Sequence, residues 1–473
     1  MAGGTWKAQD KRRPGAYINV VGNGQREAAS SLGRVLLIRD KGLGWGKNGV
    51  IEVEANSDFT KKLGTTLDDP SLTALKETLK GASKVLVLNP NEGLVGVILY
   101  LMKASKVLVL NPNEGTAATL TKEGLPWTVT ANYPGEKGNQ ITVSVEVSPA
   151  DQNAATVSTI FGTKLVDEQS IKFNELDKFK GNDYITAKVV EGGSSKPVAF
   201  TNVSGALTGG TTTESNKVES LLNDALENEE YAVVTTAGFE PSSNMNKLVV
   251  EAVKRLRENE GRKVRGVIPT DADTTYNYEG ISTVVNGYTL SDGTNVDVKD
   301  ATGYFAGISA SADVATSLTY FEVEDAVSAY PKLDNEKTIK ALDAGQIVFT
   351  TRPGQRVVIE QDINSLHKFT AEKPQSFSKN RVMRTLDEIA TDTENTFERT
   401  YLGNVGNNAA GRDLFKADRI AYLTSLQNRN MIQSFANTDI TVEAGNDMDS
   451  IVVNLAVTPV DAMEKLYMTM VVR

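Results

Sequence analysis

Residues 231–268, YAVVTTAGFEPSSNMNKLVVEAVKRLRENEGRKVRGVI, decide the fold class of this chain. Residues 232–234 form a short apolar run typical of a buried strand, and residues 264–268 form a second one. Between them, Ser242 or Ser243 can cap a helix. The side chains expected on its buried face are Leu248, Val249, Ala252 and Leu256. Short apolar strands that alternate with helices predict a mostly parallel sheet covered by helices.

The same alternation begins upstream, near residue 69. Asp69 is placed to cap a helix, and Pro70 suits the first helical position. Apolar side chains then recur at helical spacing, at Leu72, Leu75 and Leu79. Residues 84–88, KVLVL, predict the buried strand that follows this helix.

One segment is duplicated. Residues 82–93, ASKVLVLNPNEG, recur without a change as residues 104–115. Two copies are too few for a solenoid, which needs at least three repeats. We interpret the repeat as a duplication of one core strand and its turn. One copy is expected to fill the strand position, and the other is an added strand, a loop or an artefact of the expressed gene.

Two other regions have their own patterns. Residues 126–205 contain turn signals and an alternating apolar run, which predict a small all-β module. The alternating residues are Ile141, Val143, Val145 and Val147. Beyond about residue 350, a hairpin signal at residues 352–354 is followed by two amphipathic helices and two strand-like runs. This C-terminal part is therefore expected to be α+β.

Composition excludes several kinds of chemistry. The 473 residues include no Cys and one His, which excludes disulfides, thiolate metal sites, cysteine nucleophiles and His-rich metal sites. A net charge of -10 disfavours a nucleic-acid partner. The longest apolar run, residues 94–102, is far below the roughly 20 residues that cross a bilayer. The N-terminus lacks the apolar segment of a secretory signal. We expect a soluble protein, made in a cytoplasm, without a membrane anchor.

Two segments could carry catalysis or nucleotide binding. Residues 42–47, GLGWGK, are glycine-rich, but Asn48 stands where a P-loop needs Ser or Thr, so a surface turn is the better interpretation. His367 could serve a serine hydrolase, but the chain contains no G-x-S-x-G motif. An ordinary surface or capping histidine is the preferred interpretation.

Acidic and basic clusters are also interpreted as structural. Asp271 with Asp273, and Asp292 with Asp297, could offer oxygen atoms to Ca²⁺, but neither pair has EF-hand spacing. Turn formation explains these aspartates better. The basic run at residues 11–13 is short and is interpreted as part of a solvated arm.

Both ends of the chain resemble strands that lack a local partner. Residues 16–21, 451–457 and 466–473 alternate apolar and polar side chains. Such strands can add to a sheet edge on a neighbouring subunit. Pairing of the two termini within one domain is the alternative that the sequence leaves open. The candidate strand residues are Tyr17, Ile18, Asn19, Val20, Val21, Ile451, Val453, Leu455, Val457, Leu466, Tyr467, Met468, Met470 and Val472.

Several segments then reveal a family resemblance. Residues 358–364 (VIEQDIN), 377–387 (FSKNRVMRTLD) and 459–468 (PVDAMEKLYM) closely resemble the tail sheath proteins of contractile phage tails and related phage-tail-like particles, including bacteriocin-like ones. The N-terminal MAGGTW and residues 207–210 (LTGG) agree with this resemblance. The duplicated segment departs from the family pattern.

The resemblance implies a structural subunit without a cofactor or enzymatic activity. It implies hexameric rings that stack around an inner tail tube, exchange terminal strands, and contract to drive the tube through a cell envelope. Expected partners are further copies of the chain, the inner tail tube protein, and baseplate and tail terminator proteins. The particle is expected to be assembled in the cytoplasm of a bacterial host. The alternatives are a serine hydrolase that uses His367 and a β-rich surface or adhesive protein.

The resemblance and the residue patterns together predict an α/β (α+β) multidomain protein with a subtilisin-like α/β core that has no protease function. The expected divisions are an N-terminal arm (1–24), the first part of the α/β core with the duplicated strand (25–125), an inserted β-domain (126–205), the α/β subtilisin-like domain (206–350), a C-terminal α+β sheath domain (351–445) and a C-terminal strand arm (446–473).

Overall fold

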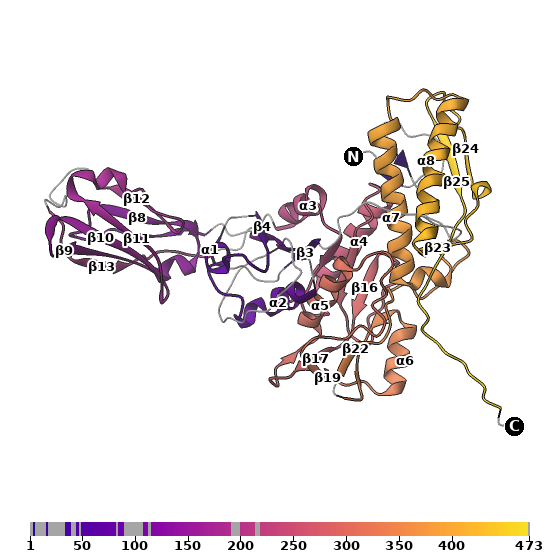
Figure 1. Cartoon of the computed structure of the whole chain (residues 1–473). Coiled ribbons are helices and arrows are strands. Elements are labelled where there is room, and N and C mark those ends of the chain that lie inside the picture. The colour runs from indigo at the N-terminus through magenta and orange to yellow at the C-terminus, as the bar shows by residue number, and fades with distance from the viewer. Residues whose placement is uncertain are drawn as a thin grey trace.

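The computed structural model of the chain describes residues 3–4, 16–17, 34–38, 44–46, 49–81, 84–88, 107–111, 115–190, 199–212, 218–354 and 356–471. Three parts follow one another along an elongated molecule (Figure 1). A β-sandwich lies at one end, a large sheet covered by helices lies in the middle, and long helices with short strand pairs lie at the other end. The expected mixed α/β multidomain fold is confirmed.

The middle part contains a sheet of eight strands in the order β20-β16-β15-β14-β3-β5-β4-β6. From β20 to β5 each strand is parallel to the next one in this order, and β4 is antiparallel to both β5 and β6. The mostly parallel sheet is therefore as predicted. The bounds are β3 Arg34–Ile38, β4 Gly49–Val53, β5 Lys84–Leu88, β6 Val107–Asn111, β14 Val233–Thr235, β15 Arg265–Pro269, β16 Ile281–Val284 and β20 Gln346–Ile347.

Helices cover both faces of this sheet, which explains why its strands are apolar throughout. Val35 and Leu37 of β3 are buried with α2 and α5, whereas Leu36 and Ile38 are buried with α3 and α4. Successive residues of a strand point to opposite faces, so each face has its own core. The bounds are α1 Phe59–Leu63, α2 Thr73–Gly81, α3 Val218–Asn228, α4 Asn244–Glu258, α5 Val298–Ser311 and α6 Asn335–Asp343.

The capping predictions hold, but the buried face of α4 differs from the expectation. Ser243 caps α4 by accepting a hydrogen bond from the backbone N–H of Met245, and Asp69 caps the single turn Pro70–Leu72 that precedes α2. Leu248, expected inside, is 46% exposed. Buried Asn246 fixes the rotation of the helix, because its amide donates to backbone carbonyls and its carbonyl accepts from Thr236. The apolar residues that α4 buries are Val249, Val250, Val253 and Leu256.

The duplicated segment forms two strands of the same sheet. β5 belongs to the first copy and β6 to the second, and β4 lies between them. Ile51 of β4 stands opposite Val87 on one side and Val109 on the other, which are equivalent positions of the two copies. Both copies therefore form strands and neither is a loop, and the second copy lies at the edge of the sheet.

The inserted β-module is a sandwich of two sheets, ordered β11-β10-β9-β13 and β12-β8-β7. The buried side chains of Ile141, Val143 and Val145 confirm the alternation predicted for β9. β7 pairs with β8, so the sandwich begins before the expected division at residues 125 and 126. The bounds are β7 Ala117–Leu120, β8 Trp127–Pro134, β9 Ile141–Ser148, β10 Asp151–Phe161, β11 Lys164–Lys172, β12 Ile185–Val189 and β13 Val203–Ala206.

Trp45 joins the middle part to the sandwich, which corrects the expectation of a surface turn at residues 42–47. Its side chain is fully buried in the sandwich core, and its ring centroid lies 5.3 Å from that of Tyr133 and 5.0 Å from that of Phe161. Its indole Nε1 donates to the Lys61 carbonyl at 3.0 Å, in α1. Gly64 accommodates this side chain: a Cβ there would lie 2.4 Å from the Trp45 Cβ, and its φ is +70°.

Two smaller strand groups lie beside the central sheet. β17 (Gly287–Leu290) pairs with β18 (Asn295–Val296) and with β19 (Ala326–Tyr330). β21 (Phe349–Arg352) and β22 (Arg356–Ile359) form the hairpin predicted around residues 352–354.

The C-terminal part packs two strand pairs against two long helices. Val382, Leu386 and Ile389, which recur at helical spacing along α7, are buried, so α7 is one of the two amphipathic helices expected here. The bounds are α7 Asn380–Thr396, α8 Ala409–Asn428, β23 Ile432–Gln433, β24 Ile440–Ala444, β25 Ile451–Leu455 and β26 Thr458–Pro459. In the part of the chain that the structure describes, no helix is both long and apolar enough to cross a membrane.

Replacing Trp45 tests its role at the junction. We expect Trp45→Ala to lower the free energy of unfolding by about 3–5 kcal/mol, because it leaves a large cavity in a closed aromatic cluster. Urea unfolding followed by circular dichroism measures this loss. Leu165→Ala, at a sandwich residue that is 53% exposed, is the control and should cost less than about 0.5 kcal/mol. Equal effects of the two substitutions would contradict the assignment.

Candidate functional site at the terminal segments

The N-terminal segment pairs locally where it is described. β1 (Gly3–Gly4) and β2 (Ala16–Tyr17) form a parallel pair in which Gly4 stands opposite Tyr17, and β1 lies against α4. Tyr17 is thus in a strand, as predicted. The other candidates of this segment lie outside the described residues, as does the basic run at residues 11–13; they are Ile18, Asn19, Val20 and Val21.

Residues 451–457 have a partner in their own chain, unlike the unpaired strand that the sequence suggested. β25 is antiparallel to β24, with Ile451 opposite Ala444 and Leu455 opposite Ile440. Val453, Leu455 and Val457 pack against the core of α7 and α8, and this burial holds the strand in place. The pair crosses the expected division at residues 445 and 446, so the arm begins later. Among the described residues, this sheet has only these two strands.

The segment after β26 behaves differently. Residues 460–471 form no helix or strand, and the segment extends away from the body (Figure 1). A strand was expected from residue 466, but among the described residues this segment pairs with no sheet. Large apolar side chains here are exposed to water: Leu466 86%, Tyr467 88%, Met468 71%, Met470 76% and Val471 78%. Val472 lies outside the described residues.

Glu464 attaches this segment to the body. Its Oε1 accepts a hydrogen bond from Thr319 Oγ1 at 2.8 Å, and its Oε2 accepts one from Gln361 Nε2 at 2.6 Å. Oε2 also forms an ion pair with Lys379 Nζ. Burial raises the pKa of Glu464, but the hydrogen bonds from Lys379, Gln361 and Thr319 hold that pKa below its usual value. The carboxylate is therefore charged at neutral pH.

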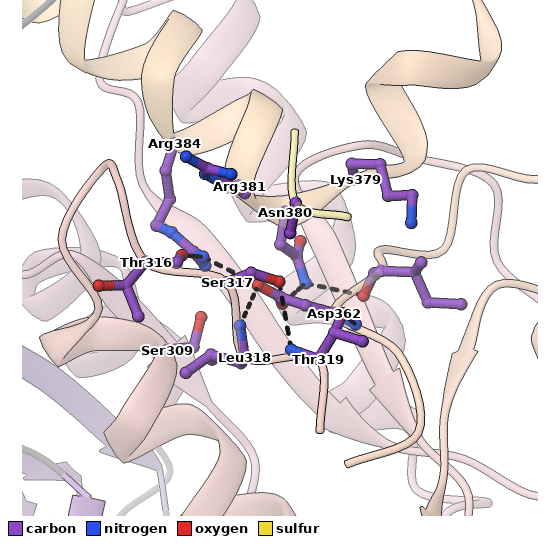
Figure 2. A network of polar contacts seen from close by, with 12 residues as sticks. Ser309, Thr316, Ser317, Leu318, Thr319, Asp362, Lys379, Asn380, Arg381 and Arg384 are labelled. Atoms are coloured by element: carbon purple, nitrogen blue, oxygen red, sulfur yellow. Dashed lines mark hydrogen bonds and ion pairs between the residues drawn. The ribbon is translucent and has the colours of Figure 1, made fainter. Parts of the chain in front are cut away.

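A buried polar network supports this attachment (Figure 2). Asp362 is 1% exposed, and its carboxylate accepts hydrogen bonds from Leu318 N at 3.1 Å, Arg384 Nη2 at 2.8 Å and Asn380 Nδ2 at 2.9 Å. Its backbone N–H donates to Thr319 Oγ1 at 2.9 Å. Thr319 thus connects the backbone of the buried Asp362 to the carboxylate of Glu464, so the start of the C-terminal segment is attached to this network.

A second buried ion pair joins α4 of the middle part to α7. The Arg257 guanidinium donates to both carboxylate oxygens of Asp387, at 2.8 and 2.6 Å, and both side chains are less than one tenth exposed. Burial lowers the pKa of Arg257, but Asp387 raises it above its usual value overall. Removing either partner would leave an uncompensated buried charge, so this pair fixes how the two parts meet.

The sequence did not identify these attachment residues. The segments around residues 377–387 and 459–468 supplied the family resemblance, but no spacing predicts that Thr319, Gln361 and Lys379 meet Glu464. They lie 145, 103 and 85 residues away from it in sequence.

The catalytic alternative has no geometric basis. His367 is half-buried, and its Nδ1 lies 3.0 Å from the backbone carbonyl of Ser365. The Ser365 hydroxyl donates instead to the Tyr278 carbonyl at 2.9 Å. Among the described residues, the His367 ring makes no hydrogen bond to a serine hydroxyl, so the structure gives the hydrolase alternative no support.

The acidic pairs are turn and cap residues. Asp271 accepts hydrogen bonds from the backbone N–H groups of Asp273 and Thr274, and Asp292 accepts one from that of Thr294. Asp297 caps α5. Within the described residues, no group of three or more acidic or histidine side chains could hold a metal ion.

One buried acid beside the Arg257–Asp387 pair has an unusual pKa. Burial, together with the nearby carboxylate of Glu398, raises the pKa of Glu394 to about 7. Burial also lowers the pKa of neighbouring Lys263 to about 8, and the Arg257 guanidinium adds to that shift. Both groups lie where α7 faces the end of α4.

Three family descriptions match successive parts of the chain: the phage tail sheath protein beta-sandwich domain (residues 113–214), its central domain (212–365) and its C-terminal domain (372–473). The phage-like element PBSX protein XkdK of Bacillus subtilis is 32% identical, over 99% of each chain. The sheath tail protein of Desulfitobacterium hafniense is 31% identical with a TM-score of 0.76, covering 96% of this chain and 99% of its own. That of Listeria innocua is 30% identical with a TM-score of 0.72, covering 94% and 96%.

These matches cover nearly the whole chain, so the chain belongs to the phage tail sheath protein family. It is a structural component of a phage tail or a phage-tail-like particle and not an enzyme. The resemblance identified from the sequence is confirmed.

The raised pKa of Glu394 predicts a pH effect on stability. The folded state binds a proton that the unfolded state releases near pH 4.5, so this group's contribution is full below that pH and is lost as pH rises through about 7. We expect Glu394→Gln to match the wild type near pH 5 and to exceed its free energy of unfolding by on the order of 2 kcal/mol at pH 8. Urea unfolding at the two pH values measures this difference. Glu372→Gln, at an exposed residue, is the control, and an E394Q effect that did not change with pH would refute the assignment.

Proposed function

We propose that this chain forms the contractile sheath itself: subunits assemble as hexameric rings that stack around an inner tail tube, and their contraction drives the tube through a cell envelope. The observation that carries the proposal is the exposed C-terminal segment. Five large apolar side chains within six residues stand in water, each at least 71% exposed. Such a segment gains stability when another subunit covers it, because burial of each of these side chains is worth about 1.5–3 kcal/mol.

Strand addition is the proposed mode of assembly. An extended segment that adds to a sheet edge satisfies its backbone N–H and C=O groups and buries alternate side chains. The pair β24–β25 offers such edges, because each strand has one strand neighbour among the described residues. We propose that residues 466–472 of one subunit, together with residues 17–21, add to the β24–β25 pair of its neighbours, with residues 451–457 serving as part of that shared sheet.

Contraction follows from a difference in buried surface between two assembled states. A state that buries less surface between subunits can persist if the barrier to rearrangement is high. When that barrier is crossed, the free-energy difference between the two states becomes available for contraction. Each subunit needs to contribute only a few kcal/mol of free energy to contraction, because a stack of closed rings contains many copies. Strand-paired arms keep the subunits connected while their bodies reorient. No nucleotide or metal is needed for this step.

The three parts of the molecule take distinct roles in this proposal. The middle part is a subtilisin-like α/β domain without protease function, and the C-terminal α+β part carries the arms. The sandwich faces outward, away from the tube. The partners are further copies of the chain, the inner tail tube protein, and baseplate and tail terminator proteins. Assembly takes place in the cytoplasm of a bacterial host.

Removing the exposed segment tests the assembly mode. We expect a chain without residues 465–473 to fold with an unchanged thermal midpoint but to remain in small species, because the described residues beyond Glu464 do not contribute to the body's core. Light scattering and negative-stain microscopy measure this. Ile339→Ser, which removes an apolar side chain that is 50% exposed on α6, is the control and should still give cylinders. Cylinders of normal length from the truncated chain would rule out C-terminal strand addition.

A further inference from the structure

Glu464 marks the point where the C-terminal segment leaves the body. Before it, Val460 N donates to the Met431 carbonyl at 3.2 Å, and Asp461 lies 3.8 Å from Lys379 Nζ. After it, residues 465–471 are all exposed, and none of them makes a hydrogen bond or ion pair with the described part of the body. The Glu464 side chain, by contrast, is 10% exposed.

The three groups that hold Glu464 come from three separate segments. Thr319 follows α5, Gln361 follows β22, and Lys379 immediately precedes α7. Thr319 is itself held by the backbone N–H of the buried Asp362 (Figure 2). One carboxylate oxygen of Glu464 accepts a single hydrogen bond, and the other accepts from two donors. These three contacts fix both the position and the orientation of the carboxylate.

We propose that Glu464 is a positioning residue for the arm: it latches the chain to the body, so that the free strand has a defined starting point and direction. This inference rests on the proposed sheath function, because a defined starting point matters only if the segment must reach a neighbouring subunit. It adds one residue, and its three partners, to the assembly mechanism.

The reach of the arm shows what the latch changes. With Glu464 held, seven described residues are free, which extend to about 23 Å at about 3.3 Å per residue. Without it, the nearest firm attachment is the Val460 hydrogen bond, and eleven described residues are free, which extend to about 36 Å. The effective concentration of the strand at its target then falls about twofold by length alone. More distant sheet edges also come within reach, so neighbouring subunits could be joined in more than one relative position.

The latch is first tested on dispersed subunits with trypsin. Cleavage after Lys465 releases the peptide 466–473, and the protease must bind the residues on both sides of this bond in extended form, including Glu464. We expect Glu464→Gln, which retains the size of the side chain but loses its charge, to release this peptide about three- to tenfold faster than the wild type. Its thermal midpoint should stay unchanged. Mass spectrometry measures the rate of release.

Two further variants separate the latch from a general loosening. Asp461→Asn is the matched control: it removes a neighbouring carboxylate whose side chain is 35% exposed and 3.8 Å from the same lysine, and it should cleave at the wild-type rate. Lys379→Met should resemble E464Q, and the double variant should cleave no faster than either single one, because one interaction is lost in all three. Equal cleavage of E464Q and the wild type would overturn the latch.

Assembly distinguishes failure of the latch from failure of the proposed function. If the wild type forms cylinders, we expect E464Q to form fewer of them, with variable diameters in negative-stain images; cylinders of wild-type number and diameter would contradict the latch and leave the sheath function standing. If the wild type forms no cylinders, the proposed function fails, and the cleavage rates still decide whether Glu464 fixes the segment.

Discussion

The constraint on which the structure depends is that residues 466–471 place large apolar side chains in water without a covering surface in the described part of their own chain. The body of the same subunit does not cover these side chains where it is described, and the segment extends away from it (Figure 1). In the proposed assembly, association removes this cost, since a neighbouring sheet edge can supply both backbone hydrogen bonds and apolar contacts. The exposed apolar segment is therefore the physical reason for the proposed assembly.

The proposed function requires a rigid subunit, because force would pass through the body to its arms. The central sheet meets this need because both of its faces are buried beneath helices. The Arg257–Asp387 pair fixes α7 to α4, and the Asp362 network fixes the loop at Thr319 to the start of α7. Trp45 in turn attaches the middle part to the sandwich, because its side chain is buried in the sandwich core and its indole donates to the Lys61 carbonyl. Each junction depends on desolvated groups, which resist gradual deformation more than exposed ion pairs do.

Local patterns predicted the elements well because each is a short-range property. The apolar runs at residues 232–234 and 264–268 overlap β14 and β15, and Ser243 caps α4. The alternation at Ile141, Val143 and Val145 predicted a strand of the sandwich. The predictions failed where a distant contact decided the outcome. Leu248 is exposed because Asn246 sets the rotation of α4. Trp45 lies in a core built from residues about 90–140 positions later. The binding of Glu464 depends equally on tertiary structure. The pairing of β25 with β24 is instead a local hairpin, because β24 ends at Ala444 and β25 begins at Ile451.

The central claim, that the C-terminal segment of one subunit lies on the C-terminal sheet of another, can be tested with thiol crosslinking, since the chain contains no native cysteine. Chains carrying only Met468→Cys and differently tagged chains carrying only Val452→Cys are mixed, assembled and treated with a short bismaleimide. The account predicts a crosslinked dimer of one chain of each kind in assembled cylinders and none in dispersed subunits. Cylinders in which both cysteines react with maleimide but no such dimer forms would contradict it.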